Sequence, residues 1–169
     1  MTIIGRDRPG LVESVARLVA DHGGNWLESR MCRLGGEFAG ILRVAVPREQ
    51  QDALSRALDG LTSQGLRIVV QPEHDAPPPS SSREASLEVV GQDRPGIVRQ
   101  IAAALARQRV NVEEFNSECH SAPMSGESLF VARARLRMPE ACNAADLRRD
   151  LEKIAADLLV DVTFEEIPH

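Results

Sequence analysis

The sequence predicts an α+β fold built from two ferredoxin-like modules, each a four-stranded antiparallel sheet with two helices on one face. The first observation is a hexapeptide that occurs twice, as residues 5–10 (Gly-Arg-Asp-Arg-Pro-Gly) and residues 91–96 (Gly-Gln-Asp-Arg-Pro-Gly). Each copy is followed at the same spacing by an asparagine, Asn25 or Asn111. The second observation is hydrophobic periodicity, which gives the order β-α-β-β-α-β in both halves.

A chain of 169 residues fits one large domain or two small ones, and the repeat favours two. A stretch rich in proline and serine separates the two copies and has little to bury, which is typical of a linker. The expected organisation is therefore a first module over 1–71, a linker over 72–84 and a second module over 85–169. Domains this small have a narrow margin of stability, so we expect the two copies to pack on each other.

In the first module we expect a short strand over 1–4, followed by a helix with Asp7 as its cap and Pro9 in its first turn. Apolar residues at helical spacing support this helix: Leu11, Val12, Val15, Leu18 and Val19. Strands over 25–34 and 38–46 should form a hairpin around Gly35-Gly36, because glycine suits both central positions of a tight turn. A helix over 48–64 and a strand over 66–70 complete the module.

The second module repeats this order, with a strand over 85–90 and a helix that opens at Asp93 and Pro95. A strand over 111–117, a longer turn over 119–127 and a sharply alternating strand over 129–138 follow. The last helix carries Leu147, Leu151 and Ile154, and the closing strand spans 159–167. A Rossmann-type sheet is the alternative, but the Gly-Gly hairpin and the short period fit it badly.

Composition excludes several classes of function. The net charge of −5 and the 3% aromatic content argue against direct nucleic-acid binding, which needs a basic face and stacking platforms. No apolar run is long enough to predict a membrane span, and no signal peptide is visible. The three cysteines are widely spaced, as expected in a reducing compartment, so we expect a cytoplasmic protein.

The repeated motif resembles the ACT domain, the small-molecule-sensing module of amino-acid metabolism. The resemblance rests on a strand, the Gly-x-Asp-Arg-Pro-Gly-[Leu/Ile]-Val motif, an apolar helix and an asparagine that opens the next strand. Ten of 25 positions are identical between residues 5–29 and 91–115. Two such modules without a catalytic domain resemble the glycine cleavage system transcriptional repressor group, although paired ACT modules also form regulatory ends of larger proteins.

The resemblance implies an effector site at the strand-helix loop and the following asparagine, commonly at a contact between modules. The residues that it assigns to ligand binding are Asp7, Arg8, Pro9, Gly10, Asn25, Asp93, Arg94, Pro95, Gly96 and Asn111. It implies no cofactor. The physical chemistry agrees, because the N–H groups at a helix start suit a carboxylate, and glycines let a ligand approach the backbone. The same motif is also a good helix start and turn on capping grounds alone.

Other candidate sites are weaker. Arg133, Arg135 and Arg137 share one sheet face, where they either are solvated, pair with acidic neighbours or meet an acidic partner. Cys119-His120 has no second pair at a metal-ligand interval, so no metal site is predicted. No nucleophile, phosphate-binding or dinucleotide-binding motif occurs, and no catalytic residues are predicted.

We therefore expect a regulatory protein rather than an enzyme. It would sense a small amino acid, with glycine or serine as candidates, and act through a DNA-binding regulator protein. The alternative is a regulatory or dimerisation module of an amino-acid metabolic enzyme that has no ligand of its own; a small enzyme ranks below both. We expect a homodimer in each case, because open sheets associate readily at their edges.

Overall fold

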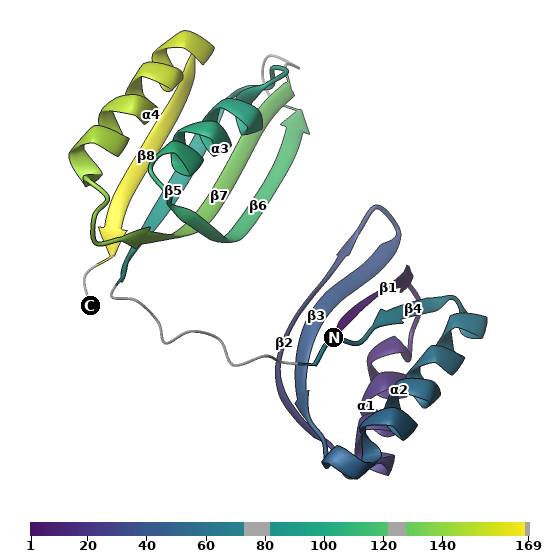
Figure 1. Ribbon diagram of the computed structural model, residues 1–169. Coiled ribbons are helices and arrows are strands. Elements are labelled where there is room, and N and C mark those ends of the chain that lie inside the picture. The colour runs from purple at the N-terminus through teal and green to yellow at the C-terminus, as the bar shows by residue number, and fades with distance from the viewer. Residues whose placement is uncertain (73–81, 122–127, 168–169) are drawn as a thin grey trace. The chain divides into compact units, whose positions relative to one another are not determined.

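A computed structural model of the chain describes residues 1–72, 82–121 and 128–167. The chain divides into two compact units, Met1–Ala76 and Pro77–His169. Each unit is a four-stranded antiparallel sheet covered on one face by helices (Figure 1). The predicted pair of ferredoxin-like α+β modules is confirmed.

The first unit has the sheet order β2-β3-β1-β4. Its elements are β1 (Thr2–Arg6), α1 (Leu11–Asp21), β2 (Asn25–Leu34), β3 (Glu37–Ala45), η1 (Arg48–Gln50), α2 (Gln51–Asp59), η2 (Gly60–Gln64) and β4 (Leu66–Val69). The second unit has the matching order β6-β7-β5-β8. Its elements are β5 (Ser82–Gln92), α3 (Ile97–Arg107), β6 (Asn111–Ser121), β7 (Ser128–Pro139), α4 (Ala144–Leu158) and β8 (Val160–Ile167).

Each unit has its own hydrophobic core between the sheet and the helices. In the first unit the core is formed by one stripe of each helix and alternate residues of the strands, including Ile3, Val15, Leu42, Leu58 and Leu66. In the second unit the predicted alternation of β7 is confirmed, because Phe130, Ala132, Ala134, Leu136 and Met138 are all buried. No polar or charged side chain is buried within the described residues.

Glycines determine two local features of the sheets. Gly35 and Gly36 join β2 to β3 with φ of 60° and 86°, which confirms the predicted turn. Gly91 of β5 lies opposite Val160 of β8, where an added Cβ would stand 2.6 Å from the valine Cγ1. Gly5 occupies the same place beside Leu66 of β4. We expected Gly5 and Gly91 to let a ligand approach the backbone, but their missing side chains make room for the neighbouring strand.

Several predicted boundaries were wrong. The opening strands are longer than expected, and β5 includes residues 82–84 that were assigned to the linker; most of the linker lies outside the described residues. The helix predicted over 48–64 is divided into η1, α2 and η2. Gly60 stands at the boundary between α2 and η2, and glycine is a poor helix former. The turn predicted over 119–127 begins later, since β6 continues to Ser121, and residues 122–127 are outside the described part.

Candidate functional site: the strand-helix loops

The two hexapeptide loops connect β1 to α1 and β5 to α3. In each loop the last glycine is the N-cap residue of the helix, and its backbone is left-handed, with φ of 89° at Gly10 and 98° at Gly96. The helices begin at Leu11 and Ile97. The prediction that an aspartate caps each helix, with the proline in its first turn, was therefore wrong. The left-handed glycine forms the cap position and leaves the aspartate and proline before the helix.

Neither helix start has a side-chain cap. The first N–H groups of a helix have no partner inside the helix, and together with the helix dipole they carry a partial positive charge. Apart from each glycine and its two neighbours in the chain, no described atom lies within 4 Å of the position that a Cβ would take at Gly10 or Gly96. Both loops therefore offer backbone donors beside open space, an arrangement that suits a carboxylate or another small anion.

The two aspartates of the motif have different surroundings. Asp7 forms an ion pair with Arg33 of β2, with 2.6 Å between its Oδ2 and the arginine Nε. At the equivalent position of the second module the arginine is replaced by Cys119. Asp93 has no hydrogen-bond or ion-pair partner for its carboxylate among the described residues, and its backbone N–H donates to the carbonyl of Ser128 at 2.8 Å. The second loop thus presents a free carboxylate that could accept from an ammonium group.

The motif arginines make local contacts. Arg8 donates from Nη2 to the carbonyl of Gln64 at 3.2 Å, which ties the first loop to the turn between η2 and β4. Arg94 donates to the Oε1 atom of Gln92 at 3.0 Å within its own loop. Pro9 and Pro95, like both arginines, are exposed.

The asparagines lie far from the loops of their own modules. Asn25 pairs with Ala45 on β3, whereas the end of β1 at Arg6 pairs with Glu37, eight residues away along the same strand. At about 3.3 Å per residue this places the asparagine some 26 Å along the sheet from the loop. Asn111 has the same position in the second module, opposite Arg137. One small ligand cannot contact the loop and the asparagine of the same module.

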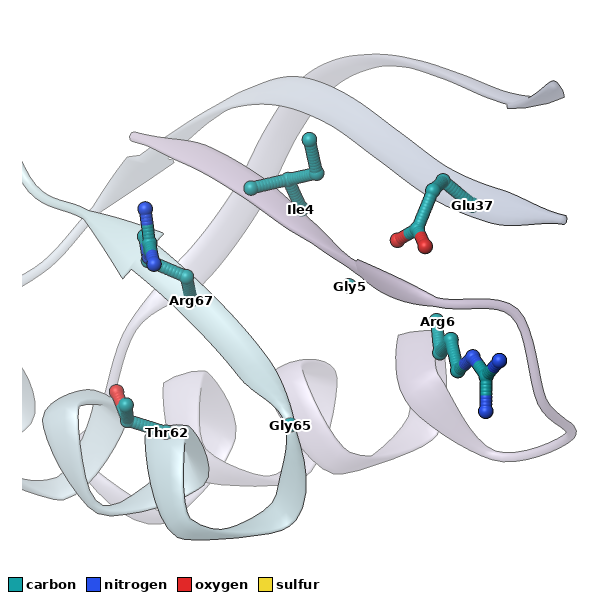
Figure 2. Close-up of a pocket in the computed structure, with 7 residues that line it drawn as sticks. All are labelled: Ile4, Gly5, Arg6, Glu37, Thr62, Gly65 and Arg67. Atoms are coloured by element: carbon teal, nitrogen blue, oxygen red, sulfur yellow. The ribbon is translucent and has the colours of Figure 1, made fainter. Parts of the chain in front are cut away.

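A shallow hollow of about 480 Å³ lies at the point where β4 begins (Figure 2). Its lining residues come from β1, β3, η2 and β4: Ile4, Gly5, Arg6, Glu37, Thr62, Gly65 and Arg67. The hollow exists because β4 starts opposite Gly5, which leaves Arg6 without a partner on that side of β1. Apart from the turn glycine Gly65, no residue pattern predicts this site, because the strand register that brings its residues together is not visible in the motif.

The arginine row of β7 is paired within the sheet. Arg133 contacts the Oε1 atom of Glu88 at 2.7 Å, while Arg135 and Arg137 both face Glu113. Glu113 stands at a bulge between Val112 and Glu114, and this bulge turns its side chain toward the two arginines. Of the three roles considered for the row, the structure shows pairing with acidic neighbours.

The described residues contain no group of three or more His, Cys, Asp or Glu side chains placed to hold a metal ion. In the same part of the chain, no helix is both long and apolar enough to cross a membrane.

Two sequence profiles of the ACT domain match the chain, one over residues 1–71 and the other over residues 85–141. The chain is a tandem ACT-domain protein. Both modules carry the glycine-capped loop between their first strand and first helix.

Similarity to known proteins extends over nearly the whole tandem ACT chain. It is 24% identical over 162 residues to the glycine cleavage system transcriptional repressor of Escherichia coli, covering 94% of this chain and 84% of the repressor. A crystal structure of an unknown protein from Galdieria sulphuraria matches with a TM-score of 0.88 and 29% identity, over 99% of this chain and 96% of the other. A candidate glycine cleavage system transcriptional repressor matches in fold, with a TM-score of 0.70 and 20% identity over 99% and 95% of the two chains.

Proposed function

We propose that this tandem ACT protein is a non-enzymatic regulator that binds a small amino acid, glycine or serine, at its strand-helix loops. The observation that carries the proposal is the start of α3, where a left-handed Gly96 leaves the first helix N–H groups without a side-chain cap. These donors suit the carboxylate that every amino acid carries. The free carboxylate of Asp93, three residues earlier, suits the ammonium group.

The second loop is the stronger site of the two. In the first loop Arg33 already neutralises Asp7, so an ammonium group would have to compete with a guanidinium group 2.6 Å away. Asn25 and Asn111 remain candidate ligand residues, although neither lies near the loop of its own module. The first loop would then bind more weakly, through its backbone donors alone.

The regulatory output would be contact with another protein. The similarity to the repressor of E. coli supports a role in transcription, and the acidic net charge of −5 favours action through a DNA-binding partner over direct DNA binding. The ligand would act by binding one conformation of the protein more tightly than another, because a ligand with equal affinity for both conformations does not change their populations.

Calorimetric titration of the full chain with glycine, serine and other amino acids tests the proposal. Binding should also raise the melting temperature, since a ligand at 100 times its Kd stabilises the folded state by about 2.7 kcal/mol. Asp93→Ala should weaken binding at least tenfold, and the matched variant Asp7→Ala should change it less. No heat and no thermal shift with any amino acid would contradict the proposal and would favour the alternative, a dimerisation module without its own ligand.

A further inference from the structure

The hollow beside β4 carries three charged side chains on the outer surface of the first module. Arg6 and Arg67 flank it at opposite ends, and Glu37 lies on β3 directly opposite Arg6 (Figure 2). None of the three makes a hydrogen bond or an ion pair with a described residue. Two guanidinium groups and one carboxylate thus line an open hollow and remain available to form hydrogen bonds and ion pairs with a ligand.

Apolar and backbone surface completes the hollow. Ile4 lies between the two arginines along the sheet and is 46% exposed, so it offers an apolar contact. Gly65 has a φ of 82°, a conformation that favours glycine, and its missing side chain keeps the hollow open. The contact from Arg8 to the carbonyl of Gln64 holds this turn against the hexapeptide loop.

The second module lacks this set of charges, although its strands have the same register. Gln92 and Leu129 form the pair that corresponds to Arg6 and Glu37. In the first module Arg67 of β4 lies opposite Ile4 of β1. At the corresponding position of the second module, Asp161 lies opposite Val90. The duplicated fold therefore does not itself require two arginines and a glutamate here, and the cluster is a property of the first module.

We propose that this hollow binds an acidic amino acid, glutamate or aspartate. Its two carboxylates would meet Arg6 and Arg67, because a guanidinium group matches a carboxylate with two parallel hydrogen bonds. Its ammonium group would meet Glu37. The charges balance, since the site carries a net charge of +1 and such a ligand carries −1. The hollow shares Gly5 and Arg6 with the first hexapeptide, but none of its lining residues is among those proposed to bind a ligand at the loops. This site does not depend on ligand binding at the start of α3.

Calorimetry with four probes on the full chain tests this site: glutamate, glutarate, glutamine and sulfate. Glutarate lacks the ammonium group, and glutamine lacks the second carboxylate, so both should bind at least fivefold more weakly than glutamate. Arg67→Gln should weaken glutamate binding at least tenfold. Glu37→Gln should abolish the preference for glutamate over glutarate. Arg17→Gln, which removes an exposed charge from α1, is the matched control and should bind as the wild type does.

Three results would overturn the inference. The first is no binding of glutamate or aspartate to the wild type. The second is sulfate binding as tightly as glutamate, which would indicate an adventitious anion site only. The third is glutamate binding that survives Arg67→Gln and is lost in Asp93→Ala, which would place the ligand in the second loop and leave the loop proposal intact. Failure of glycine and serine to bind, with glutamate binding lost in Arg67→Gln, would support this site and contradict the other.

Discussion

Asp7 and Arg33 form an ion pair, with 2.6 Å between Oδ2 and Nε, that connects the first hexapeptide loop to β2. The pair has no counterpart in the second module, because Cys119 replaces the arginine. Two loops with nearly the same sequence therefore differ in the charge that they present to a ligand. A free carboxylate stands at Asp93, and a neutralised one stands at Asp7.

Removing this ion pair should affect stability only slightly. The Arg33 side chain is 67% exposed, and exposed pairs contribute about 0–1 kcal/mol. Arg33→Ala should therefore lower the free energy of unfolding by less than about 1 kcal/mol, measured by urea denaturation. If the ion pair with Arg33 weakens ligand binding at Asp7, Arg33→Ala should strengthen amino-acid binding at the first loop. A loss above about 3 kcal/mol would instead indicate that the pair organises the loop.

The left-handed cap glycine should tolerate little substitution. Gly96→Ala should destabilise the protein by about 1 kcal/mol, because an L-residue pays this cost in the left-handed region. Gly60 is the matched control, since it has a helical φ of −59° and open space around its Cβ position. Gly60→Ala should stabilise by about 0.5–1 kcal/mol. Thermal unfolding compares the two, and equal shifts of the same sign would contradict the account of the cap.

The close approach of β5 and β8 at Gly91 predicts a much larger effect. An added methyl group would stand 2.6 Å from Val160 Cγ1 and 2.8 Å from its Cα, and the backbone atom cannot rotate away. Gly91→Ala should destabilise by about 1–3 kcal/mol, as overpacking does. Val160→Ala in the same chain relieves only the side-chain contact, so it should rescue part of the loss. Full stability in Gly91→Ala by denaturant titration would disprove the close packing.

Helix α4 has the kind of side-chain cap that was expected for α1 and α3. The Oδ1 atom of Asn143 accepts from the N–H groups of Ala145 and Asp146, at 3.0 and 3.4 Å. Asn143→Ala should lower stability by about 1 kcal/mol, whereas Asn143→Asp should keep the cap and most of the stability. Equal unfolding midpoints for the alanine variant and the wild type would show that this cap contributes nothing.

The three cysteines should differ in reactivity. Burial raises the pKa of the Cys142 thiol, and the opposing effect of Arg83 is smaller. Cys32 and Cys119 are exposed. Iodoacetamide should label these two first and Cys142 only after unfolding. Because the folded-state pKa is raised, the contribution of Cys142 to stability is complete below its unfolded pKa and is lost as pH rises through the folded value. Cys142→Ala should therefore flatten the alkaline part of the stability profile.

The fold was predictable because its signals are local and repeated. The duplicated motif, the Gly-Gly turn and the alternation of β7 each identify an element without reference to distant residues. The caps of α1 and α3 were predicted wrongly, because each helix starts after a left-handed glycine, Gly10 or Gly96, and the motif alone does not specify that conformation. The ion pair of Asp7 with Arg33 was not predicted either, because it depends on the register of β2 in the sheet. The hollow beside β4 was missed because it is formed by residues from four elements.

The start of α3 is the proposed binding site for the carboxylate of a small amino acid. Amide chemical shifts of the full chain, recorded during titration with glycine and then with serine, test this site. We expect saturable shifts of the N–H groups of Gly96, Ile97 and Val98, and much smaller shifts at the corresponding residues Gly10, Leu11 and Val12. Binding of either amino acid without shifts of the Gly96, Ile97 and Val98 amides, or no binding of either amino acid, would contradict the proposed site.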